Sequence, residues 1–186
     1  MSAPIYLDYQ ATTPVAAEAV AAMAPYWSER FGNPHSVSHR FGWEAEAAVD
    51  VARRQIATSI NADPACLVFT SGATEANNLA LKGVIEAASP ARRRLVSVVT
   101  EHSCIIETAA HLARQGVAVT LLPVGPDGLL EPTAVRAALG DDVALVSVMA
   151  VNNEIGVVQP LAEIAQAAHA AGALFHTDGA QAFGRI

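Results

Sequence analysis

Short apolar runs alternate with amphipathic stretches along the chain from about residue 65 onward. The apolar runs are rich in β-branched residues and predict five strands, at residues 67–70, 95–100, 117–122, 144–149 and 173–177. Nearly every position in these runs is apolar, as expected of strands that are covered on both faces. Helices are predicted between them, at residues 75–88, 105–115, 132–139 and 161–171, with Gly116 and Gly172 as C-caps. This alternation predicts an α/β fold, a mainly parallel sheet covered by helices in three layers.

The first 65 residues follow a different pattern. They predict an extended arm at residues 5–8, helices at residues 16–27 and 40–59, and a Gly-Asn-Pro loop at residues 32–34. No internal repeat, low-complexity tract or evident linker interrupts the chain.

Composition narrows the class of protein. With 186 residues, of which 52% are hydrophobic and 16% charged, the chain can bury a full core. A net charge of -7 argues against a nucleic-acid surface, since Arg92-Arg93-Arg94 is the only basic cluster. The apolar runs are too short to span a membrane, and the N-terminus lacks a signal-peptide pattern. Two cysteines, Cys66 and Cys104, form no disulfide framework, so we expect a cytoplasmic location.

Polar residues gather directly after four of the predicted strands. They are Ser71 and Thr74 after the first, Glu101-His102-Ser103 after the second, Asn152-Asn153-Glu154 after the fourth, and Asp178-Gly179-Ala180-Gln181 after the fifth. Ligands of open parallel sheets bind outside the carboxyl ends of the strands. These side chains are therefore expected to share one site.

The loop at residues 70–75 turns through Ser-Gly into the start of a helix. Unpaired amides at the positive end of the helix dipole suit a phosphate group, and Ser71 and Thr74 add hydroxyl donors. The same residues are also ordinary helix caps, and this alternative stays open.

Three further positions could hold an aromatic ring. Asp178 could pair with a protonated ring nitrogen, as a pyridoxal phosphate site requires, or it could cap the next turn. His102 could stack on the ring and exchange protons, or bond only to nearby backbone. Asn153 and Gln181 could donate to a phenolic oxygen or a substrate carboxylate, whereas Asn152-Asn153 could simply shape a turn.

Two other constellations compete with this interpretation. His102 and Cys104 do not face each other at a spacing of i, i+2 on a helix, so Cys104 is predicted to be a small buried residue. Among six histidines, only His35 and His39 share an i, i+4 spacing, and no third ligand for a catalytic zinc is evident. No metal site is predicted.

Motifs spread over the whole chain carry a family resemblance. They are Tyr6-Leu7-Asp8-Tyr9, Ala11-Thr12-Thr13-Pro14, Phe31-Gly32-Asn33-Pro34, Ser38-His39-Arg40-Phe41-Gly42, residues 70–75, Thr100-Glu101-His102, Val151-Asn152-Asn153-Glu154-Ile155-Gly156 and His176-Thr177-Asp178-Gly179-Ala180-Gln181. In order and spacing they resemble the bacterial cysteine desulfurases, pyridoxal phosphate enzymes of the class V aminotransferase type. Enzymes of this group supply sulfur for iron–sulfur clusters and tRNA thiolation.

The resemblance implies an incomplete large domain of the fold type I pyridoxal phosphate transferases, a three-layer α/β/α structure. Residues 1–15 would be an arm that joins the small domain, and residues 16–186 the N-terminal part of the large cofactor-binding domain.

The resemblance also assigns roles to the site residues. Ala73 and Thr74 would cradle the phosphate, and His102 would stack on the ring as the acid/base. Asn153 and Gln181 would lie near the phenolic oxygen and the substrate, and Asp178 would pair with the ring nitrogen.

The reaction that the resemblance implies removes sulfur from L-cysteine and gives alanine and an enzyme persulfide. Expected partners are a second subunit or a complementing C-terminal half, and a sulfur acceptor such as an iron–sulfur scaffold protein. Neither nucleic acid nor a membrane is expected as a direct partner.

The chain departs from the family at the groups that do the covalent chemistry. In the family, the Schiff-base lysine follows a Ser-x-His beyond the Asp-x-x-Gln motif, and the persulfide-forming cysteine comes far later. Lys82, the only lysine, falls in a predicted helix, and neither Cys66 nor Cys104 matches the nucleophile. Since covalent catalysis needs the amine and the thiolate themselves, the chain by itself is expected to be inactive.

By resemblance, the strand at residues 67–70 would pair with a later strand, and an open edge there would favour association.

Three alternatives to a cysteine desulfurase remain. Selenocysteine lyase and cysteine sulfinate desulfinase are related alternatives for the activity. A non-catalytic remnant or partner-binding fragment is the alternative from another class.

Overall fold

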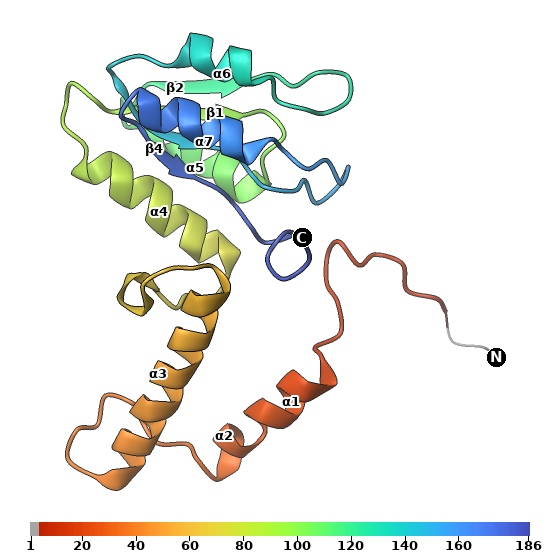
Figure 1. Ribbon diagram of the computed structural model, residues 1–186, viewed down its shortest axis with the longest axis vertical. Coiled ribbons are helices and arrows are strands. Elements are labelled where there is room, and N and C mark those ends of the chain that lie inside the picture. The colour runs from red at the N-terminus through yellow and green to blue at the C-terminus, as the bar shows by residue number, and fades with distance from the viewer. Residues whose placement is uncertain (1–3) are drawn as a thin grey trace. The chain divides into compact units, whose positions relative to one another are not determined.

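The computed structural model describes residues 4–186, which divide into two compact units between Phe69 and Thr70 (Figure 1). The elements of the first unit are α1 (Ala17–Met23), α2 (Pro25–Ser28), α3 (Arg40–Ser59) and a 3-10 turn, η1 (Pro64–Cys66). Those of the second unit are α4 (Ala73–Ala87), β1 (Arg94–Val98), α5 (Ser103–Arg114), β2 (Val119–Leu122), α6 (Pro132–Ala138), β3 (Val143–Ser147), α7 (Leu161–Ala170) and β4 (Leu174–His176).

A parallel sheet of four strands, in the order β2-β1-β3-β4, forms the centre of the second unit. Leu95 of β1 pairs with Val119 of β2 and with Leu145 of β3, and Val146 of β3 pairs with Phe175 of β4. Because every pairing is parallel, the carboxyl ends of all four strands lie at the same edge. The predicted α/β fold with a mainly parallel sheet is confirmed.

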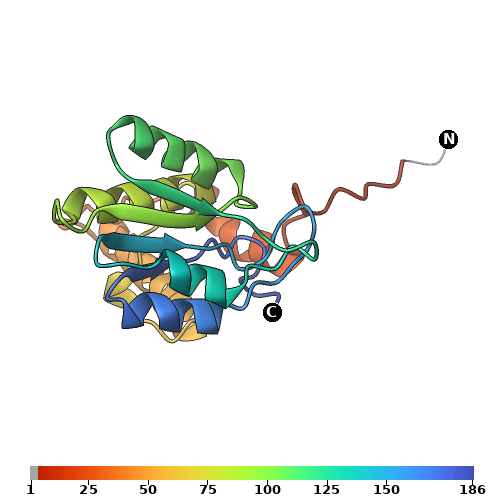
Figure 2. The same ribbon diagram turned by 90° about the horizontal axis from the view of Figure 1, so that it is seen from above.

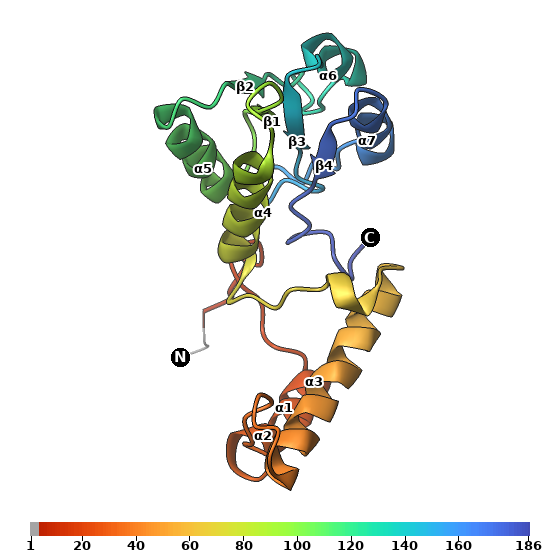
Figure 3. The ribbon, with the colours of Figure 1, turned by 90° about the vertical axis from the view of Figure 1, so that its left-hand side faces the viewer.

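Helices cover both faces of this sheet, with α4 and α5 on one side and α6 and α7 on the other (Figures 2 and 3). Neighbouring residues of one strand therefore enter different cores, since side chains alternate along a strand. Leu95 packs with Leu81 and Ile105 in the cluster beneath α4 and α5, whereas Val96 packs with Ile164 in the cluster beneath α6 and α7. The two clusters explain why the strands are apolar at nearly every position.

Gly116 and Gly172 end α5 and α7 as predicted. Their φ angles are +85° and +71°, a left-handed conformation that glycine adopts without steric cost. Beyond each glycine the next amide returns to the last turn of the helix. The amide of Val117 donates to the carbonyl of Leu112 at 3.1 Å, and that of Ala173 to the carbonyl of Ala168 at 2.9 Å.

Two of the predicted elements are wrong. Residues 67–70 form no strand, because no described strand lies alongside to accept their backbone hydrogen bonds; instead, Arg53 donates to the carbonyl of Leu67 at 2.5 Å. The helix predicted at residues 16–27 is divided into α1 and α2, because Pro25 has no N–H to continue the hydrogen-bond ladder. The remaining predicted helices and strands are present with shifted ends, and α3 begins and ends at the predicted residues.

In the loop that precedes α3, two glycines lie close to the backbone of other residues. A Cβ atom on Gly42 would lie 1.8 Å from the carbonyl oxygen of Ser36, and one on Gly32 would lie 2.1 Å from that of Phe41. Only glycine fits such distances. His39 completes the turn, since its Nδ1 accepts from the amide of Gly42 at 3.3 Å and caps α3.

Residues 1–3 of the predicted N-terminal arm lie outside the described residues, and residues 4–8 are exposed and without regular secondary structure. The division into an arm at residues 1–15 and a large domain from residue 16 stays a prediction. No helix in residues 4–186 has both the length and the apolar character needed to cross a membrane.

Candidate functional site

The loops after β1, β3 and β4 are tied together at the carboxyl edge of the sheet. The amide of Ala150 donates to the carbonyl of Asp178 at 2.9 Å, and Nδ2 of Asn152 donates to the carbonyl of Thr100 at 2.7 Å. The structure therefore brings the polar segments after these three strands to one edge, as their positions predict.

Asp178 is buried at this edge, with 8% of its surface exposed, and both carboxylate oxygens accept hydrogen bonds. Oδ1 accepts from the amide of Ala180 at 2.9 Å, so the turn-capping alternative holds for that oxygen. Oδ2 accepts from Nδ2 of Asn77 in α4 at 2.7 Å. Two donors stabilise a negative charge on a buried carboxylate.

Asn77 is a site residue that sequence reasoning missed. It is buried, and it lies one helical turn beyond Thr74, so it places the start of α4 beside Asp178. The sequence signal was its spacing from the phosphate-type loop, because a residue three positions after Thr74 lies on the same helix face.

The first turn of α4 could bind an anion at Ala73 and Thr74. Both residues are exposed, and no side chain caps the helix among the described residues. The first amides of a helix have no partner within the helix, so these groups suit an anion. Ser71, in contrast, uses its hydroxyl and its amide on Oε2 of Glu75, at 2.6 and 2.7 Å. The hydrogen bond from the Ser71 hydroxyl, with that from its amide, lowers the pKa of Glu75.

His102 and Asn153 line one cavity of about 370 Å³, together with Thr100, Glu101 and the following loop. His102 is exposed at the start of α5, where its Nδ1 accepts from the amide of Cys104 at 3.2 Å. This is the backbone bond that the sequence left open as an alternative. It uses one ring nitrogen and leaves the exposed ring as a surface on which a planar group could stack.

Asn152 shapes the turn beside this cavity. Its Oδ1 accepts from the amides of Glu154 and Ile155, at 2.9 and 3.0 Å, so the turn-forming interpretation holds for Asn152. Its neighbour Asn153 is half-buried on the cavity wall. Gln181 lies in the turn after Asp178, three residues along the chain, and it is not one of the residues that line this cavity.

Cys104 is half-buried and takes part in a contact with the site. Its Sγ accepts from Nδ2 of Asn77 at 3.3 Å, the same amide that donates to Asp178. His102 bonds to the backbone amide of Cys104. The geometry thus links α4, α5 and the end of β4 through Asn77.

Glu101, which is buried, and His176, which is half-buried, have altered pKa values. Burial raises the pKa of Glu101 to about 8, against a hydrogen bond from Met149 that lowers it, and the negative charge of Asp178 raises it further. Burial lowers the pKa of His176, and Asp178 opposes that shift. Nδ1 of His176 lies 2.9 Å from Oγ of Ser147.

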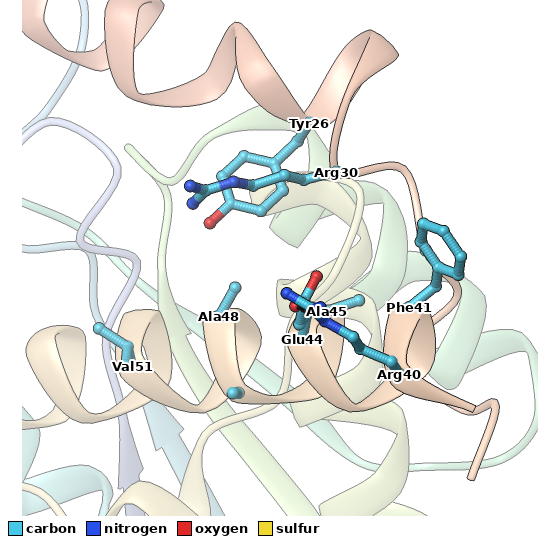
Figure 4. A pocket seen from close by; sticks show the side chains of 10 residues that line it. Tyr26, Arg30, Arg40, Phe41, Glu44, Ala45, Ala48 and Val51 are labelled. Carbon is cyan, nitrogen blue, oxygen red and sulfur yellow. Dashed lines mark hydrogen bonds and ion pairs between the residues drawn. The ribbon is translucent and has the colours of Figure 1, made fainter. Parts of the chain in front are cut away.

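A larger cavity, of about 600 Å³, lies in the first unit (Figure 4). Tyr26 and Arg30 face Arg40 and Glu44 of α3 across it, and Nε of Arg40 lies 2.5 Å from Oε1 of Glu44. None of the predicted site residues lines this cavity. Within residues 4–186, no cluster of three or more His, Cys, Asp or Glu side chains is arranged to hold a metal ion.

The sequence from residue 5 to residue 186 matches the model of the family described as aminotransferase class-V. The chain belongs to this family. The family resemblance predicted from the motifs is therefore confirmed. In this member of the family, the polar loops lie at one edge of the parallel sheet.

Relatives with a named activity are similar to this member of the class-V family over its whole length. The chain is 50% identical over 186 residues to a cysteine desulfurase IscS of Rickettsia africae, covering 100% of the chain and 45% of the relative. It thus spans about half the length of the curated relatives that it matches.

Solved structures agree with this similarity. A structure described as SspA in complex with cysteine matches with a TM-score of 0.91 and 38% identity, covering 96% of the class-V chain and 51% of SspA. A NifS-like protein matches with a TM-score of 0.94 and 33% identity, covering 98% of the chain and 50% of that protein. The fold at this identity is that of NifS-like cysteine desulfurases.

Proposed function

We propose that this class-V chain is the N-terminal part of a pyridoxal phosphate-dependent cysteine desulfurase, which removes sulfur from L-cysteine to give alanine and an enzyme persulfide. The observation that carries the proposal is the buried carboxylate of Asp178, joined by Asn77 to the helix whose exposed first turn suits a phosphate. Its relatives named as cysteine desulfurases support the reaction, and the structure of SspA with cysteine supports the substrate. The comparisons favour neither selenocysteine lyase, cysteine sulfinate desulfinase nor a non-catalytic remnant.

The donor set fits pyridoxal phosphate. Ala73 and Thr74 offer first-turn amides and a hydroxyl for the phosphate, and Asp178 offers a buried carboxylate for a protonated ring nitrogen. The exposed ring of His102 and the amide of Asn153 lie on one cavity wall, where they suit a planar ring and its oxygen substituent. The cofactor, when bound, supplies an electron sink for the bonds at the α-carbon of an amino acid.

In the proposed site, the protein's own residues would bind the cofactor and orient the substrate. Thr74 and the first amides of α4 would hold the phosphate, and Asp178 would keep a proton on the ring nitrogen because its negative charge favours the protonated form. His102, at the cavity wall, would exchange protons with the substrate. Gln181, in the turn beyond Asp178, is assigned to the phenolic oxygen by the resemblance alone.

The 186-residue chain by itself is proposed to bind the cofactor without a covalent bond and to lack turnover. Lys82, its only lysine, lies within α4, nine residues beyond Ala73, rather than in a loop at the carboxyl edge. Cys66 is exposed at the end of η1, and Sγ of Cys104 accepts a hydrogen bond from Asn77. We propose that a complementing half or second subunit supplies the Schiff-base lysine and the nucleophilic cysteine that the family resemblance implies, and that a scaffold protein accepts the sulfur. Two free thiols suit the reducing cytoplasm.

Cofactor binding tests the phosphate assignment. Titration of the chain with pyridoxal phosphate, followed by absorbance, is expected to show weak binding that Thr74→Val reduces severalfold. Thr133→Val is the matched control, since Thr133 is the exposed second residue of α6 as Thr74 is of α4. Equal affinity in the two variants would reject the assignment. After borohydride treatment, mass spectrometry that finds a stoichiometric adduct on Lys82 would reject noncovalent binding.

Activity tests the role of Asp178. When a polypeptide that carries the lysine and the cysteine restores sulfide release, Asp178→Ala is expected to remove most of it while the cofactor stays bound. A loss of well over tenfold corresponds to more than about 1.4 kcal/mol of transition-state stabilisation. Sulfide release within a factor of two of the parent would show that Asp178 only caps its turn.

A further inference from the structure

We infer that Glu101 is a positioning residue that carries a proton beneath the site: as a neutral acid it ties the end of β1 to the end of β3, and it leaves Asp178 as the negative group. The role of the proton toward the cofactor rests on the proposed function. The tie itself rests on the geometry of the chain.

Glu101 and Asp178 accept hydrogen bonds from two adjacent residues in the segment after β3. Oε1 of Glu101 accepts from the amide of Met149 at 2.7 Å, and the carbonyl of Asp178 accepts from the amide of Ala150 at 2.9 Å. The loop after β1 and the loop after β4 are thus both fixed to two consecutive amides after β3. Loss of the Glu101 contact would free the segment that leads to Asn152 and Asn153.

The second oxygen of Glu101 shows why the acid is neutral. Glu101 is 93% buried, with 7% of its surface exposed, and Oε2 has no hydrogen-bond partner among the described residues. A buried, ionised oxygen without a donor costs far more than a neutral carboxyl group. Burial also raises the pKa of Glu101 to about 8, which agrees with this geometry.

Asp178 has the opposite environment. Its two oxygens accept from Asn77 and from the amide of Ala180, whereas Glu101 receives one hydrogen bond. Two interacting carboxyl groups with such different donors separate into one acid and one carboxylate. A single negative charge would then be available to pair with a protonated ring nitrogen.

The titratable groups around Glu101 come from three segments of the described chain. Asp178 follows β4, His102 precedes α5, and Glu154, in the loop after β3, lines the same cavity as Glu101 and His102. Residues 143–150, which form β3 and its continuation, carry no titratable side chain, and Asn77 of α4 is uncharged. Asp178 is the neighbour whose charge acts on Glu101.

Carbon-13 NMR of the labelled side-chain carboxyl groups tests the inference directly on the 186-residue chain. The Glu101 signal, assigned as the one lost in Glu101→Gln, is expected to titrate near pH 8. The Asp178 signal is expected to show an inflection at the same pH, and this inflection should vanish in Glu101→Gln. A merely structural contact would not move the Asp178 signal. Titration of Glu101 at the ordinary glutamate value, or an unchanged inflection in the variant, would overturn the inference.

Stability gives a second readout. An acid whose pKa is raised on folding binds its proton in the folded state after the unfolded chain has lost it, so stability falls as the pH rises from about 4.5 to about 8. The unfolding constant is expected to rise by up to tenfold per pH unit in that window through Glu101, and Glu101→Gln should remove this contribution. Glu107→Gln, at an exposed position of α5, is the matched control and should leave the slope unchanged.

Two variants separate the contact from the charge. Glu101→Gln keeps an oxygen that can accept from Met149, so it should remain folded, whereas Glu101→Ala should unfold far more readily. If Glu101→Ala does not fold at all, the titration and the slope of Glu101→Gln still decide the question. Cofactor affinity is measured separately: a chain that binds no pyridoxal phosphate but keeps the coupled titration rejects the proposed function and leaves the neutral acid in place.

Discussion

The two units of the chain bury their apolar residues very differently. In the second unit, Leu81 and Leu145 belong to one buried cluster and Val96 and Ile164 to another, on opposite faces of the sheet. In residues 4–69, the buried residues are Gly42, Ala45 and Ala57. A sheet covered by helices contains its own core, whereas a long helix with two short ones buries little of its surface.

The first unit also exposes large apolar side chains. Trp27 is 79% exposed, Phe31 69% and Trp43 55%. Exposed apolar surface of this kind is typical of contact with another protein surface. The contrast supports the proposed second subunit or complementing half.

Removing a core side chain should give the largest difference in stability between a variant of the second unit and a variant of the first. Leu145→Ala, in β3, is expected to lower the free energy of unfolding by about 2–5 kcal/mol, because it leaves a cavity in a packed cluster. Trp27→Ala is the control in the first unit and should change it by less than about 0.5 kcal/mol. Urea unfolding followed by circular dichroism measures both. Comparable losses would show that the first unit has a core of its own.

Removing a buried donor should have the next largest effect. Asn77→Ala leaves Oδ2 of Asp178 without its side-chain donor, so we expect a loss of about 1–3 kcal/mol in the same unfolding experiment. Asn33 offers a control in the first unit, since its Oδ1 accepts from the amide of His35 at an exposed position. If Asn33→Ala costs as much as Asn77→Ala, burial does not decide the value of these hydrogen bonds.

Two helical glycines should respond to alanine with opposite signs. Gly42→Ala places a Cβ against the backbone of Ser36, so it should destabilise the first unit by about 1–3 kcal/mol. At Gly83 in α4 the added Cβ would meet no described atom within 4 Å apart from its chain neighbours and the backbone of its own helix, and alanine should stabilise the helix by about 0.5–1 kcal/mol. Amide hydrogen exchange resolves the two units separately. Stabilisation by both substitutions would contradict the close approach at Gly42.

Ion pairs should give the smallest difference. Asp142 accepts from Nε of Arg94 at 2.8 Å, and this hydrogen bond lowers the pKa of Asp142. A lowered acid pKa stabilises the fold above the ordinary value of 3.8, and the contribution is lost as the pH falls below it. Asp142→Asn should therefore lower the urea midpoint at neutral pH and have little effect in acid.

Glu44→Gln serves as the comparison for that ion pair, because Glu44 and Arg40 form an exposed pair on α3. Its effect at neutral pH should be smaller than that of Asp142→Asn, since exposed pairs contribute little. The two midpoints, measured at several pH values, check the order. Equal shifts of the urea midpoint at neutral pH would show that the lower exposure of Arg94 does not strengthen its ion pair with Asp142.

The sequence predicted the layers well because strands covered on both faces are apolar at nearly every position. The run at residues 67–70 has the same composition but forms no strand, since composition does not reveal whether a neighbouring strand is present. The division of the predicted helix at Pro25 has its signal in the sequence, because proline has no N–H to continue the hydrogen-bond ladder.

The candidate site was predictable only in part. The strand ends placed Glu101, Asn152 and Asp178 at one edge, because parallel strands share their direction. The donors to them were not predictable: Asn77 and Asp178 are 101 residues apart, and Glu101 and Met149 are 48 apart. Whether an acid is neutral depends on such contacts and on burial, and neither can be seen in residue spacing.

The hydrogen bonds between Ser71 and Glu75 have a consequence for selectivity. The carboxylate of Glu75 already occupies the two donors of Ser71, so an incoming anion meets an internal competitor that is held in place by the chain. A small monovalent acid could only exchange one carboxylate for another. A phosphate has further oxygens that can reach the amides of Ala73 and Thr74 at the same time, so we expect this loop to discriminate between anions by the number of contacts they make rather than by their charge alone.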